Sequence, residues 1–131
     1  MRSILRPALV LSTLMALAAC NDDDGPPIDQ AAADRGAGLV RDCRACHNLD
    51  GRTNLVGPHL VDLYGRQVAA VRDFEYSEVL AAQDFAWDSD TLSSFILNPT
   101  ETYPGTMMAY SGLSAQDADD ITEYFRARAR E

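Results

Sequence analysis

Two cysteines and a histidine lie within five residues of one another, in Cys43-Arg44-Ala45-Cys46-His47. A C-x-x-C-H run is typical of the covalent attachment of a c-type haem. The two thiols lie about one helical turn apart, so both can add to vinyl groups on one edge of a porphyrin. The histidine that follows is then placed under the ring, where an imidazole nitrogen can bind the iron.

Two other interpretations of this motif need residues that the chain does not supply. A structural zinc site usually has four ligands, typically with a second Cys or His pair at similar spacing. The remaining candidates, Cys20 and His59, are single and far apart. A thioredoxin-like redox pair belongs in a βαβ context, and no strand pattern flanks the motif. The motif also occurs by chance, so the rest of the chain has to distinguish these interpretations.

The N-terminal residues have the pattern of a secretory signal peptide. Two arginines precede a run from Ala8 to Ala19 that is almost entirely apolar and too short to span a bilayer. Leu17-Ala18-Ala19-Cys20 resembles the lipobox of bacterial lipoproteins, in which the cysteine is lipidated and becomes the first mature residue. We therefore expect residues 1–19 to be removed and Cys20 to carry lipid. Cleavage by an ordinary signal peptidase would instead leave Cys20 as an exposed thiol.

These features predict an exported protein that is lipid-anchored to a bacterial membrane, with its folded domain facing the periplasm. Removal of residues 1–19 leaves 112 residues with a formal charge of −11, and the chain has no lysine. This acidity argues against nucleic-acid binding and against electrostatic adhesion to anionic lipid. Membrane association should therefore come from acyl chains. Residues 20–28, acidic and rich in Pro and Gly, are expected to form a short extended tether, and residues 29–131 a single domain.

The periodicity of the domain predicts an all-α fold. A helical pattern runs from about Asp29 to Asp42, and the glycines within it suggest that another helix crosses there closely. Residues 48–73 are expected to be loop, with a short helix at Glu75–Gln83. Asp88 or Ser89 can cap a further helix that runs to about Leu97, before Asn98-Pro99 stops it. Residues 98–112 should form an irregular loop.

The last helix has a clear start signal. Ser114, with Asp117 three residues later, is similar to a capping box. An apolar stripe is expected at Ile121, Tyr124 and Phe125. The arginines at 126, 128 and 130 should complement the dipole at its C-terminal end.

Met107 and Met108 are the downstream candidates for a second axial ligand. They follow the turn Pro104-Gly105-Thr106. A lone methionine is usually core filler. In a haem protein, however, His/Met ligation favours ferrous iron and raises the reduction potential.

With these motifs together, the chain resembles class I cytochrome c over about residues 30–130. Gly57-Pro58-His59-Leu60 and Leu63-Tyr64-Gly65-Arg66 are similar to the family's Gly-Pro-x-Leu and Leu-Phe-Gly-Arg. Asn98-Pro99 followed by Pro104-Gly105-Thr106-Met107-Met108 is similar to its Asn-Pro…Pro-Gly-Thr-x-Met. The resemblance implies a small cytochrome c fold, with about four to five helices wrapped around one covalently bound haem c.

The resemblance also implies roles for individual residues. Cys43 and Cys46 would form the thioethers, and His47 and Met108 would be the axial ligands. The carbonyl of Pro58 would accept a hydrogen bond from the second ring nitrogen of His47, which fixes its tautomer.

Further residues match positions around the haem. Arg66, Tyr76 and Trp87 match those that hold the propionates, although the two aromatic residues could simply be packed in the core. Gly36 and Tyr124 match the crossing of the first and last helices.

The chain departs from the family at several positions. Phe95 stands where many members have a tyrosine whose hydroxyl reaches the methionine sulfur. Thr100 and Glu101 replace lysines that mitochondrial members carry near the haem edge, so the usual acidic partners should not be carried over. His59 is expected to be a surface loop residue.

The resulting functional hypothesis is a membrane-tethered electron carrier between respiratory or other redox partners, and not an enzyme. Its partners would be membrane complexes with a basic docking patch, with no small-molecule substrate. One alternative is a haem subunit of a larger oxidoreductase complex. Another is an open-site haem sensor or peroxidase-like protein, in which the methionine loop is displaced.

Overall fold

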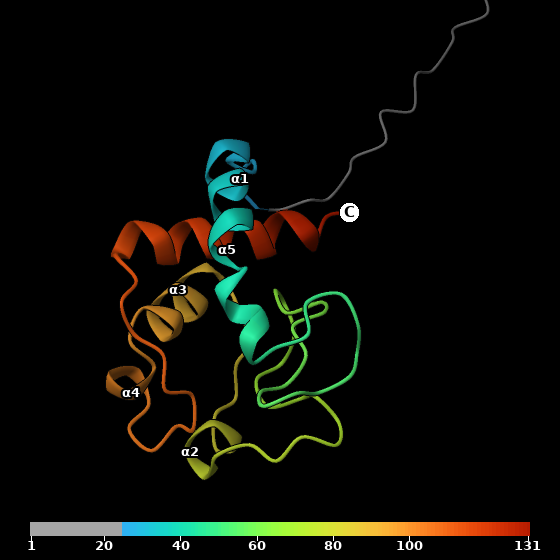
Figure 1. The fold of residues 1–131 in the computed structure, drawn as a ribbon, viewed down its shortest axis with the longest axis vertical. Helices are drawn as coiled ribbons and strands as arrows, with labels where there is room; N and C mark the ends of the chain where they lie inside the picture. Colours follow the sequence, from blue (N-terminus) through green and yellow to red (C-terminus); the bar gives the residue numbers. More distant parts are fainter. Residues whose placement is uncertain (1–24) are drawn as a thin grey trace, which may run out of the picture.

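The computed structural model describes residues 25–131, so residues 1–19 and the expected lipidation site Cys20 lie outside the described part of the chain. The described residues form five α-helices and one 3-10 helix (Figure 1): α1 Gln30–Leu39, η1 Asp42–Ala45, α2 Glu78–Ala81, α3 Ser89–Leu97, α4 Pro99–Thr102 and α5 Ala115–Arg128. Their only β pairing is an isolated bridge between Gln67 and Ala86, which confirms the all-α prediction. None of these helices has the length and apolar character needed to cross a bilayer.

The crossing of α1 over α5 holds the two ends of the domain together (Figure 1). A Cβ atom on Gly36 would lie only 2.1 Å from the backbone oxygen of Asp120 and 2.9 Å from Cβ of Tyr124. The neighbouring Arg35 donates two hydrogen bonds, of 2.7 and 2.8 Å, to the buried carboxylate of Asp120. The crossing predicted at Gly36 and Tyr124 is confirmed, because only a residue without a side chain fits there.

The helix starts agree with the capping signals in the sequence. The side chain of Asp88 accepts a hydrogen bond of 2.9 Å from the backbone of Thr91, and the Thr91 hydroxyl accepts one of 2.9 Å in return. At α5, Ser114 and Asp117 form the same reciprocal pair, with two bonds of 3.1 Å. Each box satisfies backbone donors that the first helical turn leaves unpaired.

Three elements differ from their predicted extent. α1 ends at Leu39 rather than near Asp42, because the chain tightens into η1 before the cysteine motif. α2 is only four residues long. Asn98 and Pro99 end α3 as expected, but they also start α4, which was predicted as loop. Pro99 occupies the first helical turn, where a missing N–H costs nothing, and the Asn98 side chain caps the helix.

The core lies between α3, α5 and the long loop of residues 46–77, which joins η1 to α2. Its buried members include Leu92 and Phe95 of α3, Ile121 and Phe125 of α5, and Trp87 just before α3. Aromatic rings meet within it, with Trp87 and Phe95 at a centroid distance of 5.3 Å. The predicted stripe on α5 therefore faces this core, with Tyr124 partly buried beside it.

Candidate haem-binding site

The cysteine motif is folded into a single tight turn after α1. The amides of Cys46 and His47 both donate to the carbonyl of Cys43, at 3.1 and 2.8 Å. No disulfide joins the two cysteines; Cys43 is half-buried and Cys46 is exposed. Burial, followed by the nearby charge of Asp42, raises the pKa of the Cys43 thiol. The turn therefore leaves both sulfurs available for thioether bonds.

The imidazole of His47 is held in one orientation by the residues that follow it in the loop. Its Nδ1 lies 2.7 Å from the carbonyl oxygen of Pro58, so Nδ1–H donates and Nε2 carries the lone pair. A Cβ on Gly57 would lie 2.3 Å from Cε1 of His47, so glycine provides the space that the ring occupies. Burial is the main cause that lowers the pKa of His47. Iron binds the neutral form of imidazole, and the hydrogen bond to Pro58 leaves Nε2 open for it.

The two methionines differ in exposure. Met108 is partly buried against the core, whereas Met107 is 62% exposed. Gly105, with a φ of +98°, makes the turn before them, and the amide of Met108 donates to the hydroxyl of Thr106 at 3.4 Å. Of the two, Met108 is therefore the one that the loop turns inward.

The three residues assigned to the propionates lie together. The Trp87 amide donates to the carbonyl of Arg66 at 2.9 Å. Burial raises the pKa of the Tyr76 hydroxyl, and the charge of Arg66 opposes that rise. The Arg66 guanidinium also donates to backbone carbonyls of the loop, including that of Val61 at 2.8 Å. Trp87 is 7% exposed and packs against Phe85. It can therefore pack in the core and also contact a propionate.

Sequence reasoning missed one candidate. The hydroxyl of Ser77, next to Tyr76, is buried and has no hydrogen-bond partner among the described residues. Ser77 precedes α2, but its side chain does not cap that helix. A buried donor without a partner needs an acceptor, and a carboxylate on a bound group would supply one. This orphaned hydroxyl, together with the His47 ring that packs against Gly57 and the donor set, fits a haem.

One expectation about the loop was wrong. His59 is buried, with 7% of its surface exposed, and is not a surface loop residue. Its amide is held by the side chain of Asn54 at 3.1 Å, and its carbonyl accepts a hydrogen bond from Arg66 at 3.2 Å. These backbone bonds turn its ring into the protein. In the sequence His59 follows a Gly-Pro pair, which is typical of an exposed turn, so its burial could not be predicted from its position.

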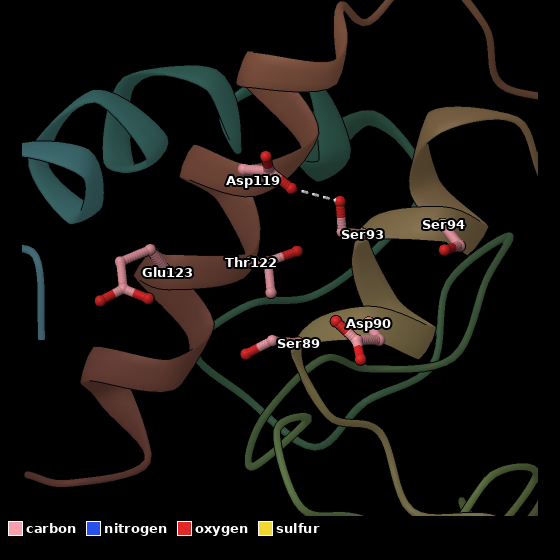
Figure 2. Close-up of a pocket in the computed structure, with 7 residues that line it drawn as sticks. All are labelled: Ser89, Asp90, Ser93, Ser94, Asp119, Thr122 and Glu123. Carbon is pink, nitrogen blue, oxygen red and sulfur yellow. Dashed lines mark hydrogen bonds between the residues drawn. The ribbon is translucent and has the colours of Figure 1, made fainter. Parts of the chain in front are cut away.

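A separate surface hollow lies between α3 and α5, away from these residues (Figure 2). Hydroxyl and carboxylate groups line it, and Ser93 donates to Asp119 at 2.6 Å. None of the haem-site residues contributes to its lining: Ser89, Asp90, Ser93, Ser94, Asp119, Thr122 and Glu123. It adds negative charge to this face.

Comparison with known proteins agrees with this geometry. The model of the family "Cytochrome c" matches residues 33–128, so the chain belongs to the cytochrome c family. It is 39% identical over 98 residues to a "Cytochrome c homolog" of Rickettsia bellii, covering 73% of this chain and 57% of that protein. It is 33% identical over 95 residues to "Cytochrome c2 iso-2" of Magnetospirillum molischianum, covering 72% and 97%.

A solved structure confirms the fold. Cytochrome cH from Methylobacterium extorquens superimposes with a TM-score of 0.66 at 29% identity, covering 72% of this chain and 97% of that one. The chain spans little more than half the length of its rickettsial relatives. Family membership, with Cys43 and Cys46 at the C-x-x-C-H spacing, implies one covalently bound c-type haem.

Proposed function

We propose that this protein is a single-haem electron carrier in which His47 and Met108 provide the two axial ligands. The observation that carries the proposal is the fixed His47 imidazole, with Nδ1 bound to Pro58 at 2.7 Å and Nε2 left to bind metal. Bound haem supplies an iron that exchanges single electrons. With His47 and Met108 as its ligands, the iron would have no free coordination position for a substrate, as suits a carrier rather than a catalyst.

The surroundings of His47 suit this role. The ring is confined by Gly57 and by its hydrogen bond, so it has little freedom to change position. The buried hydroxyl of Ser77, which has no partner among the described residues, offers a donor for a propionate, and Arg66, Tyr76 and Trp87 would supply further donors. A donor to a carboxylate in a buried setting forms a strong hydrogen bond. The haem edge that bears the propionates is thus held by the protein's own side chains.

We also propose that lipid on Cys20 anchors the mature protein to a bacterial membrane, with the haem domain in the periplasm. The apolar N-terminal run and the lipobox-like Leu17-Ala18-Ala19-Cys20 support this. Its redox partners would then be proteins of the same membrane. Because the mature chain is strongly acidic, a partner with a basic docking patch fits it best.

The test of the haem ligands is optical spectroscopy of protein matured in a periplasm. We expect the oxidised protein to show the weak long-wavelength band that methionine sulfur gives on ferric haem. Met108→Ala should abolish this band, whereas the matched control Met107→Ala should keep it, because Met107 is exposed. A wild-type protein without the band, whose ferrous form takes up carbon monoxide, would contradict the proposal and favour the open-site alternative.

A further inference from the structure

The first described residues, 25–29, lie against the last helix; we call them the N-terminal strap. Arg126 of α5 donates to the carbonyl of Pro26 at 2.7 Å and to that of Pro27 at 2.8 Å. The carboxylate of Glu123 accepts a bond of 2.6 Å from the amide of Asp29. Residues 25–28 of the expected extended tether are therefore bound to the domain, and Arg126 has a role beyond complementing the helix dipole.

Of the two side chains that hold the strap, Arg126 is buried and Glu123 is partly buried. The side chains of Arg126 and Glu123 are 8% and 14% exposed, and they pair at 2.6 and 2.8 Å. Pairing with Arg126 is the main cause that lowers the pKa of Glu123. Removing a charge from water is costly unless its hydrogen bonds are satisfied, and here the strap's carbonyls satisfy the guanidinium. Arg126 and the strap thus depend on each other.

The strap joins the domain at the end of α1 that is opposite to the haem motif. Asp29 caps the start of α1, and the cysteine motif follows its other end. The helix has ten residues, so roughly 15 Å along its axis separates these ends. In Figure 1, α2, α4 and the long loop also lie on the far side of α5 from the start of α1.

We propose that the Arg126–Glu123 pair fixes the orientation of the domain relative to the membrane, with the haem end pointing away from the lipid. This rests on the proposed lipid anchor at Cys20. With the strap bound, Cys20 lies five residue steps before Gly25, a reach of at most roughly 18 Å. With the strap released, the reach from Cys20 to Asp29 is roughly 32 Å, and the domain can turn its haem end toward the bilayer.

The distribution of charge agrees with this orientation. The mature chain is strongly acidic, but two arginines lie in the last turn of α5, at 126 and 128, and a third follows the helix at 130. Arg130 lies over Gly25, with Nη2 2.6 Å from the position of a Cβ there. Negative lipid headgroups attract nearby arginines and repel carboxylates. The end of the domain nearest the anchor is therefore repelled less by a negatively charged membrane surface than the rest of the domain.

The test uses the lipidated, haem-loaded protein bound to phosphatidylcholine vesicles that contain a fluorescent headgroup probe. Haem quenches the probe more strongly as it approaches the surface. Arg126→Gln should raise the quenching at least about twofold, because the released strap widens the reach from roughly 18 to roughly 32 Å. Arg128→Gln is the matched control: it removes a charge from the same turn but leaves the strap's bonds intact, because Arg128 donates to the Tyr124 hydroxyl at 2.7 Å. Phosphatidylcholine carries no net charge to attract Arg128, so quenching should not change.

A second variant does not depend on how well Arg126→Gln folds. Six Gly-Ser residues inserted between Asp24 and Gly25 leave the pair intact but lengthen the reach, so quenching should also rise. Adding Arg126→Gln to this insertion should then change little. Equal quenching by the wild type and both variants would overturn the orientation proposal alone. Failure of the wild-type protein to bind vesicles would overturn the lipid anchor, and the orientation proposal with it.

Discussion

Replacing Gly36 by alanine should force α1 and α5 apart. The new Cβ would lie 2.1 Å from the backbone oxygen of Asp120, whereas real Cβ contacts are essentially never below 3.0 Å. The obstacle is backbone, so the helices must separate by about 0.9 Å. A gap of that size forfeits a quarter to a half of the dispersion energy of the atom pairs it separates. It also stretches the bonds from Arg35 to Asp120.

The expected net loss is about 2 kcal/mol. Overpacking typically costs up to about 3 kcal/mol, and alanine returns about 1 kcal/mol because it favours helix over glycine. Guanidinium unfolding of the haem-loaded protein, followed by fluorescence of its single tryptophan, would measure the change. For a slope of about 3 kcal/mol per molar, the midpoint should fall by roughly 0.7 M.

Gly38 provides the control within the same helix. A Cβ there would meet only the flexible end of Arg41, at 3.8 Å. Gly38→Ala should therefore raise the unfolding midpoint, in line with a gain of about 0.5–1 kcal/mol. A Gly36→Ala midpoint equal to or above that of the wild type would refute the argument that the close crossing requires glycine.

Three further predictions follow from the site and the charges. Gly57→Ala should displace the His47 ring, because the new Cβ would lie 2.3 Å from Cε1 of that ring. The haem spectrum should change while thioether attachment persists. An unchanged spectrum would contradict this displacement. Hydrogen bonding from Arg35 holds the pKa of Asp120 below its ordinary value. The ionised Asp120 carboxylate therefore stabilises the folded protein above about pH 4, and this contribution is lost as the pH falls through the lowered pKa. Asp120→Asn should therefore destabilise the protein at neutral pH, and its unfolding midpoint should converge on that of the wild type in acid; a gap that stays constant would contradict this. Electron exchange with a basic partner should slow as ionic strength rises, and stopped-flow rates that are flat or increase with salt would exclude docking by opposite charge.

The features that the sequence predicted well are those set by local chemistry. The caps at Asp88 and Ser114 involve residues three apart, so their hydrogen bonds can be inferred from spacing alone. Gly36 was informative because it is costly within a helix, which points to a close neighbour. The family motifs then identified candidate site residues within the loops, where periodicity says little.

The features that the sequence did not predict depend on contacts between distant segments. Arg126 looked like an ordinary arginine at a helix end, yet its partners lie about a hundred residues earlier. Ser77 has the position of a helix cap, so its unpaired hydroxyl emerges only once its burial is known. His59 is buried because Asn54 and Arg66 hold its backbone. No pattern along the chain encodes these three arrangements.

The crossing of the first and last helices also determines an order of assembly. Arg35 meets Asp120 across 85 residues of sequence, and the cysteine motif lies just after α1. A chain that emerges from its N-terminus therefore presents both thiols long before α5 exists to close the fold. In the closed domain the Cys43 side chain is half-buried, so its sulfur is harder to reach than on the open chain. Haem attachment is thus easiest on the open chain, and docking of α5 afterwards encloses a group that is already bonded.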